Sequence, residues 1–145
     1  MTVFKRKIDD SLKVWQTSPL RQPLMLRGAR QVGKSFAVKE LAKSSYSNFF
    51  EVNFEQKPSL KKIFSKDLDP TVIISELSLV FGKTIRPEVD LIFFDEIQEC
   101  PQAIVALRYF YEQANQYHVI AAGSLLEFAL QKISTPVGRI AYEYM

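Results

Sequence analysis

A glycine-rich loop between an apolar run and an amphipathic segment is the sequence feature that most constrains the fold. Residues 28–35 read GARQVGKS and fit the pattern G-x-x-x-x-G-K-[ST]. The apolar run Leu24–Leu26 precedes the loop, and the segment Ser35–Lys43 carries apolar residues at a helical period. Because the pattern requires a strand before the loop and a helix after it, the sequence predicts strand, phosphate-binding loop and helix in that order.

The loop predicts a nucleotide site. Successive backbone N–H groups of such a loop point into one concavity at a helix N-terminus, where the partial positive charge favours phosphate. Lys34 would bring its charge to the β- and γ-phosphates of ATP, and the Ser35 hydroxyl would be a ligand of Mg²⁺. A glycine turn without a ligand would leave Lys34 unexplained. The predicted nucleotide-binding residues are Gly28, Ala29, Arg30, Gln31, Val32, Gly33, Lys34 and Ser35.

A second candidate element is the run LIFFDEIQE over 91–99. Asp95 ends the strand-like stretch Asp90–Asp95, and a second acid, Glu96, follows it directly. Such a run is typical of a strand buried on both faces of a parallel sheet. An acid at its end would lie at the carboxyl edge of the sheet, beside the glycine loop. We therefore expect Asp95 to bind Mg²⁺ with Ser35, and Glu96 to act as the general base that deprotonates an attacking water.

The acidic pair also has a plainer interpretation, because strands often end in solvated acids. Its position roughly sixty residues after a glycine loop favours the nucleotide site. A kinase takes its nucleophile from a second substrate and does not need a water-activating carboxylate here. Glu96 therefore favours hydrolysis over phosphoryl transfer to another molecule.

A third candidate is Ser124, which follows the apolar run His118–Ala122 and Gly123. Its hydroxyl could contact the γ-phosphate or the attacking water from the sheet edge, as a third catalytic residue. It could equally cap a helix that begins at Leu125, with Glu127 completing a capping box. Both interpretations stay open at this stage.

The order of the predicted elements indicates the fold class. Strands alternate with helices, which predicts an α/β fold of three layers around a parallel sheet. The predicted strands are 24–26, 48–54, 90–95, 118–122 and 139–144, and the predicted helices are 4–16, 35–43, 58–64, 71–81, one starting at Pro101 and 125–133.

Charge is uneven along the chain. Residues 1–66 hold 14 Lys and Arg against 5 Asp and Glu, within an overall net charge of +3. A basic half could attract nucleic acid. Aromatic residues are not interleaved with the basic ones as base stacking would require, so we expect most of these lysines to solvate helix faces.

The remaining composition bears on location. Only one cysteine, Cys100, is present, and no basic-then-apolar leader precedes the first charged run, which favours a cytoplasmic setting. The longest largely apolar stretch, 119–130, is too short to span a bilayer, so no membrane association is expected. The single histidine, His118, opens a predicted strand and is expected to be structural.

The motifs together resemble one family. The chain reads RGARQVGKS over 27–35, DEIQ over 95–98 and GS at 123–124, followed by GRI at 138–140. This combination resembles the prokaryotic AAA-type ATPases, whose members typically carry RGARQVGKT, DEIQ and TGSS. The resemblance covers nearly all of the chain.

The resemblance implies a P-loop ATPase core with an N-terminal helix and strand order 5-1-4-3-2. Lys34 and Ser35 would be the Walker A residues, Asp95 and Glu96 the Walker B pair, and Ser124 the sensor. Ala122 stands where the family usually has threonine. Family members also continue into a C-terminal domain, so residues 1–145 are expected to be a single ATPase core truncated at its C-terminus. An end inside a predicted strand agrees with that.

Three functions follow as hypotheses. The first is a Mg²⁺-dependent ATPase in which Glu96 activates water. The second is a module that binds ATP with little or no turnover, because the missing C-terminal part would supply groups around the γ-phosphate. The third is a small-molecule kinase. In a self-associated form, Arg139 could reach a neighbour's γ-phosphate as an arginine finger, although a surface charge explains it as well.

Overall fold

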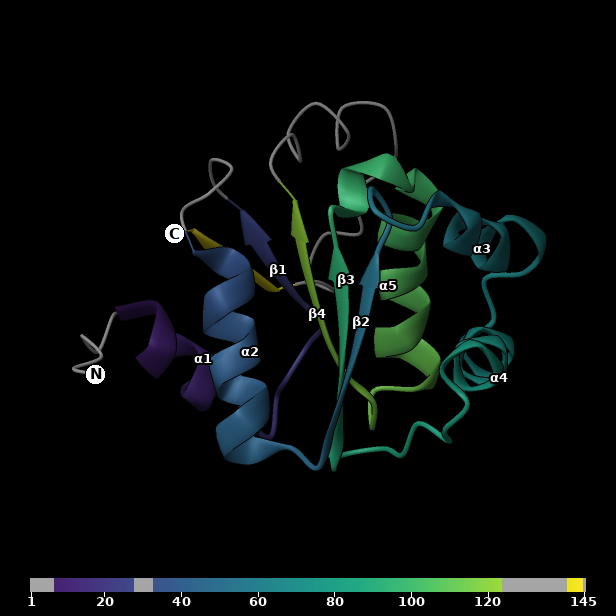
Figure 1. Cartoon of the computed structure of the whole chain (residues 1–145). Coiled ribbons are helices and arrows are strands. Elements are labelled where there is room, and N and C mark those ends of the chain that lie inside the picture. The colour runs from purple at the N-terminus through teal and green to yellow at the C-terminus, as the bar shows by residue number, and fades with distance from the viewer. Residues whose placement is uncertain (1–6, 28–32, 124–140, 145) are drawn as a thin grey trace.

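The computed structural model describes residues 7–27, 33–123 and 141–144, and shows a parallel sheet between helices (Figure 1). The strands are β1 (Leu24–Arg27), β2 (Asn48–Asn53), β3 (Asp90–Asp95), β4 (His118–Gly123) and β5 (Ala141–Tyr144). Their order is β2-β3-β4-β1-β5, and every neighbouring pair is parallel. Counted from the β5 edge this is 5-1-4-3-2, so the predicted fold class and strand order are confirmed.

Helices cover both faces of the sheet. On one face lie α1 and α2, and on the other lie α3, α4 and α5 (Figure 1). The helices are α1 (Lys7–Thr17), α2 (Lys34–Ser45), α3 (Ile63–Lys66), α4 (Pro70–Phe81) and α5 (Pro101–Gln113), with two short 3-10 helices, η1 (Pro58–Lys62) and η2 (Ile97–Glu99). None of the helices in the described ranges is long and apolar enough to cross a membrane.

Strand β3 is buried along its whole length, as its apolar run predicts. Ile92 and Phe94 belong to the core under α3, α4 and α5. Leu91 and Phe93 belong to the core under α1 and α2. Alternate side chains of a strand point to opposite faces, so one run of four apolar residues supplies both cores.

Local signals explain where α4 begins and ends. The Asp69 carboxylate accepts a hydrogen bond of 2.9 Å from the Thr71 backbone N–H, and Pro70 occupies the first turn. At the other end Gly82 adopts a left-handed conformation, with φ of 66°. These are the usual helix start and stop residues, and the predicted helix over 71–81 is present with Pro70 added.

Some predicted boundaries differ from the observed ones. Strand β2 ends at Asn53 and not at residue 54, because the Asn53 side chain accepts hydrogen bonds of 3.0 Å from the backbone N–H groups of Glu55 and Gln56 and turns the chain. The predicted helix 58–64 is a 3-10 turn followed by α3. The predicted helix 125–133 and the first residues of the predicted helix 4–16 lie outside the described residues.

A buried histidine joins β4 to the α1 side of the sheet. His118 is 5% exposed, and its Nδ1 atom lies 2.6 Å from the Tyr46 hydroxyl oxygen. The Trp15 ring meets the imidazole edge-on, with centroids 5.8 Å apart. Burial, with a smaller effect from the charge of Arg21, lowers the pKa of His118 to about 4.

This burial predicts a pH-dependent stability. Below pH 6.5 the unfolded chain takes up a proton at His118 that the folded chain takes up only near pH 4, so stability falls as the pH drops. Between pH 7 and pH 5 we expect His118 to account for a loss of about 2 kcal/mol. Urea unfolding of wild type and His118→Gln at both pH values measures this. Equal losses in the two proteins would contradict the assignment.

Candidate functional site

The carboxyl ends of four strands, β1 to β4, lie together with the start of α2 at one edge of the sheet. In the sheet register Arg27 of β1 lies beside Gly123 of β4, and Asn53 of β2 lies beside Asp95 of β3. Helix α2 starts at Lys34, directly after the loop that follows β1. In a parallel α/β sheet ligands bind at this edge, where helices begin and strands end.

Lys34 is almost fully buried at this edge. The residue is 8% exposed, and its Nζ atom donates a hydrogen bond of 3.2 Å to the Gly123 backbone oxygen. Gly33, the residue before α2, has φ of 84°, a left-handed conformation that favours glycine. A buried ammonium is stabilised by nearby acceptors or anions, so this position is suited to a phosphate.

Asp95 connects the end of β3 to α2. The Ser35 hydroxyl donates to Asp95 Oδ2 over 3.0 Å, and the Glu96 backbone N–H donates to Asp95 Oδ1 over 2.9 Å. Asn53 contributes a longer contact of 3.5 Å between Nδ2 and Asp95 Oδ2. Burial raises the pKa of Asp95 above its ordinary value, although the two hydrogen bonds and the charge of Lys34 oppose that effect.

The oxygens of Ser35 and Asp95 form a donor set suited to Mg²⁺. Magnesium prefers hard oxygen ligands and is usually held by one or two protein groups together with substrate phosphates and waters. The 3.0 Å hydrogen bond places the hydroxyl and the carboxylate at one point of the sheet edge. A cation there would favour the ionised form of Asp95, which burial disfavours.

Glu96 has an unusual backbone for its residue type. Its φ is 52° and its ψ is 47°, a left-handed conformation that costs a non-glycine residue on the order of 1 kcal/mol or more. Its side chain is partly buried, and its Oε2 atom accepts a hydrogen bond of 2.6 Å from Gln98 Nε2. The Glu96 carboxylate is therefore held in a defined direction immediately after Asp95.

Two of these residues were not predicted from the sequence. Asn53 is the last residue of a strand, and only the register with β3 shows that it lies beside Asp95. Gln98 stands two residues after Glu96 in the quoted motif, but no spacing rule assigns it a contact. A polar residue at the end of each parallel strand is the signal that could have pointed to Asn53.

Several predicted positions lie outside the described residues. They are Gly28, Ala29, Arg30, Gln31, Val32, Ser124 and Arg139. Of the predicted set the structure places Lys34, Ser35, Asp95 and Glu96 at one edge of the sheet, with Gly33 at the start of α2.

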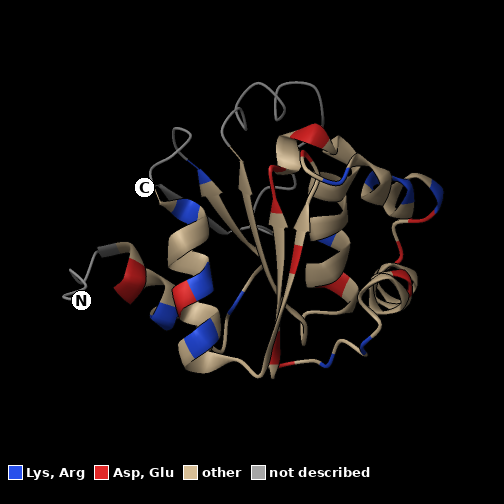
Figure 2. Ribbon diagram, viewed as in Figure 1, with Lys and Arg blue, Asp and Glu red and all other residues tan. Residues whose placement is uncertain are grey.

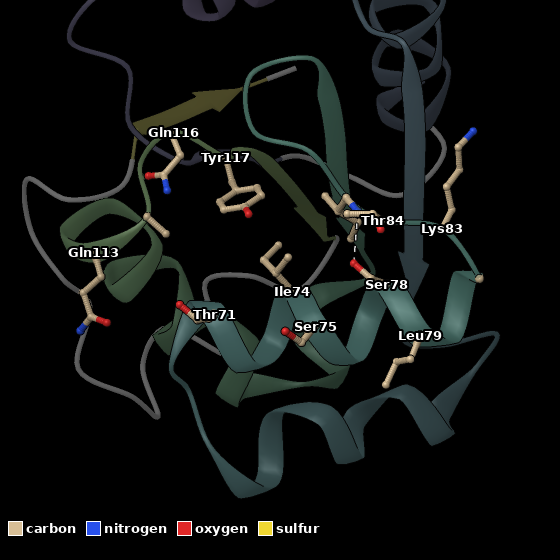
Figure 3. Close-up of a pocket in the computed structure, with 13 residues that line it drawn as sticks. Thr71, Ile74, Ser75, Ser78, Leu79, Lys83, Thr84, Gln113, Gln116 and Tyr117 are labelled. Carbon is tan, nitrogen blue, oxygen red and sulfur yellow. Dashed lines mark hydrogen bonds between the residues drawn. The ribbon is translucent and has the colours of Figure 1, made fainter.

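A hollow of about 750 Å³ lies near the amino ends of β3 and β4, whereas the candidate site lies at the carboxyl ends of the strands (Figure 3). It is lined by α4, by the residues that follow α5 and by those that precede β3, including Ile74, Thr84 and Tyr117. The Ser78 hydroxyl accepts a 3.1 Å hydrogen bond from the Ile85 backbone N–H at its wall. None of Lys34, Ser35, Asp95 or Glu96 lines it, so it is separate from the candidate site.

The lysines of the first half that the structure describes lie on more than one face of the molecule. Figure 2 shows lysines on α2 and around α3, which lie on opposite faces of the sheet. Lys39 and Lys43 are on α2, whereas Lys61, Lys62 and Lys66 are on η1 and α3. These five lysines are thus divided between separate surfaces.

Comparison with known proteins gives two findings. A model of the family described as AAA domain matches residues 20–145. Among solved structures, a Walker-type ATPase of Pyrococcus abyssi is similar over 98% of this chain and 53% of its own, with a TM-score of 0.59 and 17% identity. At that identity the likeness shows the fold alone, and this chain spans about half the length of that protein. No curated protein matches the chain.

Proposed function

The chain belongs to the AAA domain family of nucleotide-binding ATPase modules, and from this premise we propose that it binds ATP with Mg²⁺ and hydrolyses it at the carboxyl edge of its sheet. The observation that carries the proposal is the contact between Ser35 and Asp95, 3.0 Å apart, beside the buried Lys34. It joins the residue types needed for phosphate and for metal at one place.

Phosphate binding is assigned to Lys34 and to the backbone of residues 28–33. The Lys34 ammonium would neutralise negative charge on the β- and γ-phosphates, as in other phosphate-binding loops. Its burial makes the attraction stronger than it would be in water, because screening by solvent is reduced.

Metal binding is assigned to Ser35 and Asp95. When bound, Mg²⁺ would neutralise charge that develops on the phosphate oxygens. The Glu96 backbone N–H, which donates to the other carboxylate oxygen of Asp95, fixes the direction in which Asp95 presents Oδ2. Asn53 supports the same oxygen from β2.

Hydrolysis is assigned to Glu96 as general base. Its carboxylate would accept a proton from a water molecule while the water oxygen forms a bond to the γ-phosphorus. The bond from that phosphorus to the β–γ bridging oxygen breaks, so ADP leaves with the electron pair and inorganic phosphate is formed.

The binding half of the proposal is tested by Lys34→Ala. We expect the affinity for a fluorescent ATP analogue to fall at least tenfold, because one charge-assisted contact to phosphate is lost. Lys39→Ala, an exposed lysine on the same helix, serves as the matched control and should bind like wild type. Unchanged affinity in Lys34→Ala, with the protein folded by circular dichroism, would contradict the site.

A further inference from the structure

Gln98 donates a side-chain hydrogen bond to the carboxylate of the candidate base, Glu96. It lies in η2, two residues after Glu96, and its Nε2 atom donates to Glu96 Oε2 over 2.6 Å. An ionised carboxylate can only accept hydrogen bonds, so the nitrogen of the amide, and not its oxygen, must face Glu96. The orientation of the Gln98 amide is therefore determined by this contact.

This orientation is unfavourable for the rest of the Gln98 side chain. With the nitrogen turned to Glu96, the Gln98 Oε1 atom is buried and has no hydrogen-bond partner within the described part of the chain. A buried carbonyl oxygen without a partner loses the hydrogen bond it would make to water, which destabilises the folded state. Such a group in a native protein calls for an explanation.

A second unfavourable feature lies two residues away. Glu96 has a left-handed backbone, with φ of 52°. Its N–H group donates to Asp95 Oδ1 over 2.9 Å, and the fully buried Ile97 anchors the chain between Glu96 and Gln98. Backbone strain and unpaired polar atoms that persist in a fold cluster at functional sites, where surrounding contacts enforce them.

Two hydrogen bonds hold Glu96 at opposite ends of the residue. The Asp95 bond fixes the backbone end of Glu96, and the Gln98 bond fixes one oxygen at the far end of its side chain. Holding one carboxylate oxygen also fixes the direction of the other. The amide performs this without taking up a proton itself, since it does not titrate near neutral pH.

We propose that Gln98 is a positioning residue for ATP hydrolysis, which holds the Glu96 carboxylate in the direction from which it accepts the proton of water. This inference rests on the hydrolysis proposed above. General-base catalysis requires the base within hydrogen-bond reach of the proton, and a misplacement of about 1 Å can lower a rate by about a hundredfold. A bond that fixes the base therefore acts on kcat and not on nucleotide binding.

The test is Gln98→Met, which nearly keeps the side-chain volume and removes both the donor and the buried oxygen. We expect kcat for phosphate release to fall at least tenfold, KM for ATP to stay within about twofold, and the melting temperature to be equal or higher. A merely structural bond predicts the reverse, a lower melting temperature and unchanged kcat. Gln102→Met, at an exposed glutamine on α5, is the matched control.

A second variant covers the case in which the methionine disturbs folding. Gln98→Asn keeps the amide but is one methylene shorter, so it loses the 2.6 Å contact and should also lower kcat. In the Glu96→Gln background, Gln98→Met should have no further effect, because the group it positions is no longer a base.

The outcomes separate the two proposals. A wild-type kcat well above that of Glu96→Gln, with Gln98→Met and Gln98→Asn as active as wild type, overturns the positioning role alone. An equal loss from Gln98→Met in both backgrounds also overturns it. If wild type is no faster than Glu96→Gln, hydrolysis itself is overturned, and the positioning role with it.

Discussion

Replacing Glu96 with glutamine is expected to lower kcat for ATP hydrolysis at least a hundredfold while ATP affinity changes only a few-fold. General-base catalysis contributes about 10²–10⁴ to a rate, and glutamine keeps the shape of glutamate but cannot accept the proton. The substitution should not change the backbone strain at position 96, because glutamate and glutamine are both non-glycine residues of the same shape in a left-handed conformation. Lys34, Ser35 and Asp95, which are assigned to phosphate and metal, remain in place.

Steady-state phosphate release with ATP and Mg²⁺, together with binding of a fluorescent analogue, measures both quantities. Glu99→Gln is the matched control, because Glu99 is an exposed glutamate three residues after Glu96, at the end of the short helix η2. Background-level release from both wild type and Glu96→Gln, with intact binding, would leave a nucleotide-binding module. Phosphate found on an added small molecule and not in water would indicate a kinase.

The sequence predicts most of the scaffold of this site, because its signals are local. The loop pattern specifies a strand and a helix on either side, and LIFF followed by two acids specifies a buried strand ending at the ligand edge. The strand and the helix beside the loop are β1 and α2, and the buried strand is β3. The contact between Ser35 and Asp95 follows from this topology, since a parallel sheet brings those ends together.

The sequence does not predict the groups that orient the site residues. The contact of Asn53 with Asp95 depends on the register between β2 and β3, which a single strand pattern leaves open. The left-handed conformation at Glu96 has no local signal, because the position holds no glycine or asparagine. The Gln98 contact depends on that backbone turn, and so could not be read from spacing.

Truncating Phe94 to alanine is expected to have the largest effect on stability, a loss of about 3–5 kcal/mol. The side chain is fully buried, and its ring contacts Phe64 and Phe110 edge-on, with centroids 5.4 and 6.4 Å apart. A third ring, Phe54, lies at 6.0 Å. Alanine would leave a cavity between β3, α3 and α5 that these rigid rings cannot close.

Thermal and urea unfolding measure this loss, and a fall in melting temperature of about 10 °C or more is expected. Leu79→Ala is the surface control, because Leu79 is 81% exposed on α4 and should change stability by no more than about 0.5 kcal/mol. Equal losses from Phe94→Ala and Leu79→Ala would contradict the assigned core.

The same substitution connects the core to the site. Phe94 directly precedes Asp95 in β3, and the Phe54 backbone N–H donates to the Asp95 backbone oxygen over 3.2 Å. A cavity beneath this point would loosen the strand end that presents Asp95 and Glu96. We therefore expect kcat to fall even at temperatures where Phe94→Ala is fully folded, because catalysis requires those carboxylates to be held by a rigid scaffold. Phosphate release by Phe94→Ala well below its melting temperature tests this, and a wild-type kcat there would show that the end of β3 is held independently of the core beneath it.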